Sequence, residues 1–151
     1  MFTLVPSGFF DPAAERETLA EVANIEEGTK VAHIDIPQYD AVLIYTVGGD
    51  SGVSAPEILN VLQDLPKCGE YNKILCSIVD DVLYVGIAQG KSLLLANSYK
   101  VQNFTSAEYF IFLAMKSLQL NPEVSTICWR TPLDADDEMS LYRYFKAVEI
   151  L

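Results

Sequence analysis

Apolar residues in the first part of the chain form short runs separated by turn-forming residues. Runs rich in β-branched and aromatic residues predict strands, and apolar residues at spacings of three and four predict helices. Asp11 followed by Pro12 is typical of a helix start, because Asp caps the first turn and Pro fits its first position. The expected strands are 2–5, 31–36 and 41–47, and the expected helices are 12–23 and 56–65.

Glycines cluster between the third strand and the second helix, in the segment Gly48-Gly49-Asp50-Ser51-Gly52. Glycine-rich loops can hold phosphates through their backbone N–H groups. No Gly-Lys-Ser/Thr follows this segment, and its spacing is not Gly-x-Gly-x-x-Gly, so it lacks the patterns of known phosphate loops. We therefore interpret it as a connecting loop.

The second half of the chain has a clearer order of elements. Three strands joined by two tight turns predict an antiparallel meander, and a helix, a strand, a helix and a strand follow. Both faces of the first two strands are largely apolar, so we expect the sheet to be covered on both sides. The expected strands are 72–79, 82–88, 92–100, 125–129 and 147–151, and the expected helices are 105–120 and one that Asp134 or Asp136 caps.

This order is shared by ribonuclease-H-like and actin-like domains. It predicts an α/β protein of the actin-like ATPase or ribonuclease-H-like fold, with residues 71–151 forming the C-terminal lobe and residues 1–66 a partial N-terminal lobe. The helix 105–120 is apolar nearly all round, which indicates that the first lobe or a partner covers its outer side. Thr105 and Glu108 have the spacing of a capping box at its start.

The charge of the chain narrows the range of its partners. The chain has 21 acidic and 10 basic residues and a formal net charge of −11, which repels phosphate backbones and anionic lipids. We therefore expect no nucleic-acid partner. No apolar run approaches the roughly 20 residues that span a bilayer, and no signal peptide opens the sequence, so we expect no membrane insertion and a cytoplasmic location.

Three cysteines and one histidine form no recognisable metal site. Cys68, Cys76 and Cys128 lack Cys-x-x-Cys spacing, and His33 completes no ligand set with them. Cys76 and Cys128 sit inside apolar runs, and free cysteines are among the most often buried residues, so we expect these two thiols to lie in the core. We expect His33 at the surface, and Trp129 in the core rather than stacked on an adenine.

Several segments of the chain match the pattern of a known family. They are the strand LLLANSYK, the helix TSAEYFIFLAMKSLQLNPE, the stretch STICWRTPLDADDEMSLYRYF, the closing KAVEIL and the early FTLVPSGFFDP. Together they resemble a Bacteroidetes family of uncharacterised proteins, a domain-of-unknown-function group whose fold is similar to that of actin-like ATPases. Members of that family carry an extra stretch before the early segment, so the resemblance implies that the first lobe is partial here.

The resemblance directs attention to the loops that bind nucleotide in actin-like ATPases. Those proteins hold phosphates at the turn between the first two strands of each lobe, usually with an Asp-x-Gly pattern. The matching turn here, Asp80-Asp81, has the aspartate and lacks the glycine, and the loop Trp129–Leu133 lacks the glycine pair of the adenosine loop. Should ATP bind with Mg²⁺, Asp80, Asp81 and Arg130 are its candidate ligands.

Three functions are compatible with this fold. A ribonuclease-H-like nuclease needs carboxylates around two metal ions. Asp80, Glu108 and Asp134 lie near the required places, but each has a local role in a turn or a helix cap. A nucleotide-binding actin-like ATPase would lack its usual glycines. We therefore favour a non-catalytic structural or regulatory interaction module that binds a protein partner or a second copy of itself, with no cofactor and no metal assigned.

Overall fold

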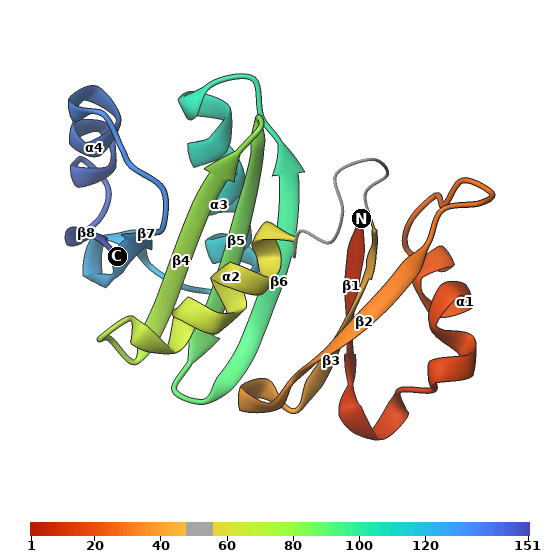
Figure 1. The fold of residues 1–151 in the computed structure, drawn as a ribbon. Coiled ribbons are helices and arrows are strands. Elements are labelled where there is room, and N and C mark those ends of the chain that lie inside the picture. Colours follow the sequence, from red (N-terminus) through yellow and green to blue (C-terminus); the bar gives the residue numbers. More distant parts are fainter. Residues whose placement is uncertain (48–55) are drawn as a thin grey trace. The chain divides into compact units, whose positions relative to one another are not determined.

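The chain consists of two compact units, Met1–Pro56 and Glu57–Leu151 (Figure 1). The computed structural model describes residues 1–47 and 56–151. The predicted connecting loop, Gly48 to Gly52, lies outside the described residues. The helix expected at 56–65 belongs to the second unit, because it packs against the second unit's own sheet. The units therefore divide about ten residues before the boundary that we expected after residue 66.

The first unit is a three-stranded antiparallel sheet with one short helix. The central strand pairs with both others, so that Leu43 lies opposite Leu4 on one side and Ile34 on the other. The predicted helix 12–23 is shorter than expected, since a 3₁₀ turn occupies its start. Asp11 caps that turn by accepting a hydrogen bond from the Ala13 N–H at 3.0 Å. The elements are β1 (Phe2–Pro6), α1 (Glu15–Ala20), β2 (Val31–Ile36) and β3 (Ala41–Thr46).

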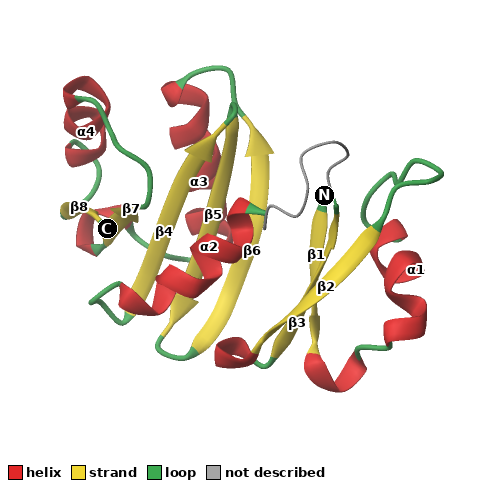
Figure 2. Cartoon of the chain, in the orientation of Figure 1, coloured by secondary structure: helices red, strands yellow, loops and turns green. Residues whose placement is uncertain are grey.

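The second unit contains a five-stranded mixed sheet with the strand order β6-β5-β4-β7-β8 (Figure 2). The first three strands in the sequence form the predicted antiparallel meander, and the last two run parallel to the first. The strands are β4 (Asn72–Val79), β5 (Val82–Gln89), β6 (Ser92–Lys100), β7 (Thr126–Trp129) and β8 (Ala147–Ile150).

Helices cover both faces of this sheet, as the apolar pattern predicted. Helix α2 (Glu57–Asp64) crosses one face, and α3 (Phe104–Ser117) lies against the other (Figure 1). Helix α4 (Ala135–Tyr142) follows β7 and contacts β8. Alternate residues of β5 face opposite sides of the sheet. Val85 and Ile87 join the core beneath α3, whereas Gly86 faces Val61 and Leu65 on the α2 side.

The predicted capping box of Thr105 and Glu108 is wrong. Asn103 is the N-cap of α3, and its side-chain oxygen accepts from the Ser106 N–H at 2.8 Å while the Ser106 hydroxyl accepts from the Asn103 N–H at 3.1 Å. The box is therefore formed two residues earlier than expected. Asp134 caps α4 as predicted, by accepting from the Asp137 N–H at 2.8 Å.

The core residues expected from the sequence are buried. Cys76 and Cys128 are buried free thiols of the second unit, and Trp129 is fully buried. Cys68, for which the sequence carried no core expectation, is a buried free thiol as well. The Trp129 ring contacts Phe104 with 5.6 Å between ring centres. Within residues 1–47 and 56–151, no helix has the length and apolar character needed to cross a membrane.

Gly86 sets how closely α2 approaches the sheet. A Cβ at this position would lie 2.9 Å from Val61 Cγ1 and 3.3 Å from Leu65 Cδ2. We expect Gly86→Ala to lower the free energy of unfolding by about 1–2 kcal/mol, because the overpacking outweighs the gain from replacing glycine in a strand. Urea unfolding measures this change. Gly69→Ala is the control, since nothing lies within 4 Å of its Cβ position, and an equal loss in both variants would contradict the prediction.

Candidate functional site

Asp80 and Asp81 form the two-residue turn between β4 and β5. Both have left-handed backbone conformations, with φ of 51° and 60°, and Val79 pairs directly with Val82. Positive φ at both central residues is the geometry of the tight hairpin turn that matches strand twist, and Asp tolerates it better than most residues. Two aspartates at this place are therefore accounted for by the hairpin itself.

A pocket of about 360 Å³ lies beside this turn. Its lining includes Asp80, Asp81 and the end of β6 with Lys100 and Gln102, and the Val101 N–H donates to the Asp81 carbonyl at 2.9 Å. The pocket thus offers two carboxylates and one ammonium group. Carboxylates repel phosphate unless a cation lies between them, so a nucleotide would need Mg²⁺ or Lys100 to offset the turn's charge.

Arg130, the third predicted ligand, forms ion pairs within the protein. It follows β7, and its guanidinium donates to Glu57 Oε1 from Nε at 2.7 Å and to Asp64 Oδ2 from Nη1 at 3.0 Å. Ser77 also donates to Glu57 Oε1, at 2.8 Å, and Asn60 donates to Oε2 at 3.1 Å. We call this set the Arg130 clamp: Arg130, Glu57, Asp64, Ser77 and Asn60.

Electrostatics favour the ionised state of every charged group in the Arg130 clamp. Burial alone would raise the pKa of Glu57, but the hydrogen bonds from Arg130, Asn60 and Ser77 outweigh it and lower that pKa. The hydrogen bond from Lys67 and the contact with Arg130 lower the pKa of Asp64. The same carboxylates raise the pKa of Arg130. The guanidinium is thus neutralised by groups of its own unit.

The structure therefore brings together only part of the predicted site. Asp80 and Asp81 share one pocket, whereas the hydrogen bonds and ion pairs of the Arg130 guanidinium in the described residues go to Glu57 and Asp64. Sequence reasoning missed these two partners. Their spacing of seven residues places them on one side of α2, two turns apart, and that spacing was the available signal.

The three carboxylates considered for a nuclease serve other contacts. Asp80 is in the hairpin turn, and Asp134 caps α4. Glu108 is buried, and both of its carboxylate oxygens lie 2.9 Å from the Ser140 hydroxyl, which ties α3 to α4. Burial raises its pKa, although the Ser140 hydrogen bond opposes this. Among the described residues, no group of three or more His, Cys, Asp or Glu side chains is placed to hold a metal ion.

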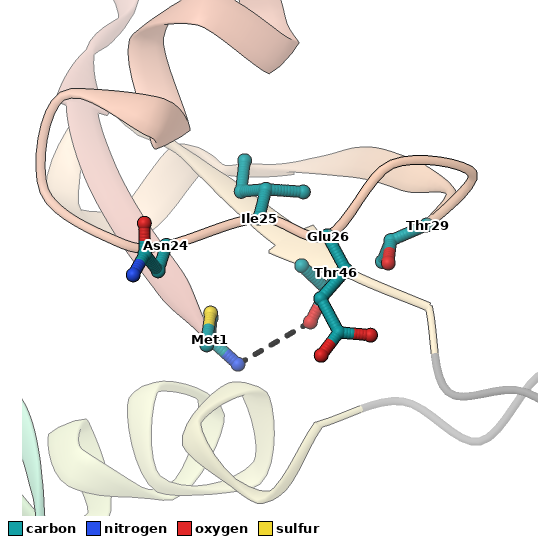
Figure 3. A pocket seen from close by; sticks show the side chains of 6 residues that line it. All are labelled: Met1, Asn24, Ile25, Glu26, Thr29 and Thr46. Carbon is teal, nitrogen blue, oxygen red and sulfur yellow. Dashed lines mark hydrogen bonds between the residues drawn. The ribbon is translucent and has the colours of Figure 1, made fainter.

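The first unit has its own pocket, of about 520 Å³ (Figure 3). It lies between the loop after α1 and the adjoining ends of β1 and β3, and the Met1 amine donates to the Thr46 hydroxyl at 3.3 Å. His33 belongs to this unit and lies at its surface as predicted, with Nδ1 2.6 Å from Glu15 and its ring against Phe10. Among the described residues, those that line this pocket include no cysteine, histidine or basic side chain.

Comparison with known proteins places the chain in a family. A family model described as "Protein of unknown function (DUF3822)" matches residues 54–148, which include nearly all of the second unit. The chain belongs to this family. No curated protein matches the sequence.

A solved structure is similar to this DUF3822 member over nearly its whole length. It is a Bacteroides thetaiotaomicron protein with an actin-like ATPase fold and unknown function, with a TM-score of 0.81 and 17% sequence identity. The alignment covers 99% of this chain and 64% of that chain. At this identity the likeness shows the fold alone, and it confirms the predicted actin-like fold. The family model and this Bacteroides structure together confirm the resemblance to a Bacteroidetes family of unknown function.

The Arg130 clamp predicts a specific loss of stability. We expect Arg130→Met to lower the free energy of unfolding by about 1–3 kcal/mol, because it leaves the partly buried Glu57 carboxylate without a cation and leaves Asp64 with Lys67 alone. Lys146→Met is the matched control. Its ion pair with Glu70 spans 3.5 Å between half-exposed side chains, so its loss should cost less than about 1 kcal/mol.

The difference between wild type and Arg130→Met should also depend on pH. The folded-state pKa of Glu57 lies below its ordinary value of 4.5, so its contribution is present above that value and is lost as the pH falls through the folded pKa. Urea unfolding at pH 7 and at successively lower pH measures the difference. A difference that stays constant down to the acid limit would contradict the ion-pair explanation.

Proposed function

We propose that this chain is a cytoplasmic, non-catalytic interaction module that binds a protein partner through one side of its second unit. The observation that carries the proposal is an exposed apolar and aromatic surface along α3. Tyr109 is 61% exposed, Leu113 is 49% exposed and Tyr144 is 47% exposed. We call this the α3 surface and define it by Tyr109, Phe112, Leu113, Lys116 and Tyr144.

The α3 surface is continuous. Tyr109 and Leu113 are one turn apart on α3, as are Phe112 and Lys116. The Phe112 ring meets the edge of Tyr144 at 4.9 Å between ring centres, and this contact connects α3 with the segment after α4. Large aromatic residues and clustered exposed apolar area are enriched where proteins bind one another. A surface of this composition supports a docking role.

The candidate nucleotide residues support the non-catalytic part of the proposal. Arg130 is neutralised by Glu57 and Asp64, so using it on a phosphate would leave partly buried carboxylates behind. The Asp80-Asp81 turn carries two negative side chains where actin-like ATPases usually have a glycine. The charge of −11 further disfavours polyanionic ligands.

Nucleotide binding is the second candidate function. The actin-like fold favours it, and the pocket beside Asp80 and Asp81 with Lys100 is the place that would hold Mg²⁺ and phosphate. Its support is a fold analogy, which is a weaker argument than a surface present on this chain.

Partner capture tests the interaction module. We expect wild-type protein to retain a defined protein from a lysate of its source cells, and Leu113→Glu to lose it, because a carboxylate in a desolvated apolar contact is costly. Val22→Glu makes the same kind of change at a residue 66% exposed in the first unit and should retain the partner. Equal capture by both variants, or none by wild type, would refute the proposal.

Thermal unfolding with Mg-ATP separates the two candidate functions. A ligand that binds only the native state raises the melting temperature. We expect millimolar Mg-ATP to leave the melting temperature unchanged within error. A rise of several degrees that disappears in Asp80→Asn/Asp81→Asn would establish the nucleotide site. It would contradict the proposal that the chain is an interaction module without a bound nucleotide. Asn is suitable here because it removes the charge and still tolerates the left-handed turn.

A further inference from the structure

A second pocket of the second unit, of about 560 Å³, lies where α3 ends. Its lining includes Phe112 and Lys116 from α3, Leu120 and Pro122 from the residues that follow α3, and Arg143 and Tyr144 directly after α4. Helix α3 and the segment after α4 thus contribute one cation and one aromatic ring each. We call this the α3-end pocket.

We infer that the α3-end pocket binds an apolar side chain of a peptide ligand while Lys116 and Arg143 bind a carboxylate next to that side chain. The inference rests on the proposed interaction function and deepens it, because it states the chemistry of the partner. The pocket adjoins the α3 surface and shares Phe112, Lys116 and Tyr144 with it.

The two cations of this pocket are available for a ligand. In the part of the chain that the structure describes, neither Lys116 nor Arg143 lies within ion-pair distance of a carboxylate. Lys67, Arg130 and Lys146 by contrast are paired with acidic side chains. Two cations without an ion pair lie in this one pocket, in a chain with about twice as many acidic as basic residues.

The apolar part of the pocket is shaped by the end of α3. Gln119 adopts a left-handed conformation with φ of 59°, and the Leu120 N–H returns to the Met115 carbonyl at 2.9 Å. This closing turn ends the helix, and Leu120 and Pro122 line the pocket together with the aromatic pair. Phe112 and Tyr144 meet edge to face, at an angle of 65°. Leucine, proline and phenylalanine offer an apolar side chain a place out of water.

Charge and shape favour a peptide carboxylate over other anions. Glu123 also lines the pocket, so the local balance of Lys116, Arg143 and Glu123 is a single positive charge. One carboxylate matches that charge, whereas a polyphosphate or nucleic acid would bring several negative charges to a chain of net −11. The exposed side chains of Leu113 and Tyr109 continue from the pocket along α3, which gives an extended ligand further contacts.

Amide chemical shifts of the isotope-labelled full chain test the inference. The probe is the blocked peptide acetyl-Gly-Glu-Leu-Phe-Glu-Gly-amide, and its matched counterpart has glutamine in place of both glutamates. We expect the acidic peptide to shift amides of residues 112–123 and 143–144 and to bind more tightly than its counterpart. The Lys116→Gln/Arg143→Gln variant should weaken binding about five- to thirtyfold, as expected for two exposed charge contacts.

The control variant is Lys30→Gln/Lys91→Gln, which removes the same charge from two exposed lysines outside the pocket. It should bind the acidic peptide like wild type. Equal affinity for the two peptides, equal weakening in both variants, shifts that map elsewhere, or no binding would overturn the inference. Preferential binding of phenylacetate or of a single-stranded oligonucleotide, or dimerisation that the pocket variant abolishes, would assign the pocket to another occupant and also overturn it.

Failure of the pocket inference can be distinguished from failure of the proposed function. If Leu113→Glu abolishes partner capture while Lys116→Gln/Arg143→Gln leaves peptide binding unchanged, the interaction function stands and the pocket inference fails. If the acidic peptide binds at the pocket with the expected charge dependence while no partner is captured, the pocket stands and the interaction function fails.

Discussion

The sheet of the second unit has two apolar faces, and the unit is stable only if both are covered. The core beneath α3 includes Trp129 and Ile111, and α3 is 14 residues long. The opposite face receives α2, which has eight residues and is far too short to persist as an isolated helix. Its conformation must therefore come from the tertiary structure. Gly86 allows α2 to approach the sheet closely, and Arg130 binds α2 at Glu57 and Asp64.

This dependence explains why Arg130 has a structural role in a fold related to nucleotide-binding proteins. The guanidinium reaches Glu57 at the first turn of α2 and Asp64 at the last. Withdrawing it towards a phosphate would leave Glu57 with only neutral donors, Ser77 and Asn60, in a partly buried place. The cost of that uncompensated charge would count against the binding energy of any ligand. A residue that stabilises the fold in this way is a poor ligand even where its sequence position suggests one.

Most of the strand pattern could be predicted from the sequence, because alternation and tight turns are local properties. The strands β4 and β6 have the expected bounds. The start of α3 could not be resolved locally, since Asn103 and Thr105 are both good caps, with Ser106 and Glu108 three residues after each. In the structure the Glu108 carboxylate accepts from Ser140, 32 residues away in the chain, so its partner lies outside the cap.

The candidate site was predicted in part for the same reason. The turn at Asp80-Asp81 is a local signal, and the structure has it as a hairpin. The partners of Arg130 lie 73 and 66 residues away in the chain, so only the packing of α2 on the sheet reveals them. The seven-residue spacing of Glu57 and Asp64 places both on one side of α2, but the side chain that they meet there is set by the whole fold.

Several basic side chains of this chain bind groups within the protein. Arg16 binds the carbonyls of Glu26 and Thr29, and Lys73 binds those of Cys68 and Glu70. With so few cations in a chain of net −11, each one that stabilises the fold is withdrawn from ligand binding. The cations that remain uncommitted are consequently more informative about recognition than the residues inherited with the fold. Arg130 forms ion pairs within the unit, whereas Lys116 and Arg143 are exposed side chains at the ends of α3 and α4. This contrast separates cations that hold elements of the fold together from cations that form no ion pair among the described residues.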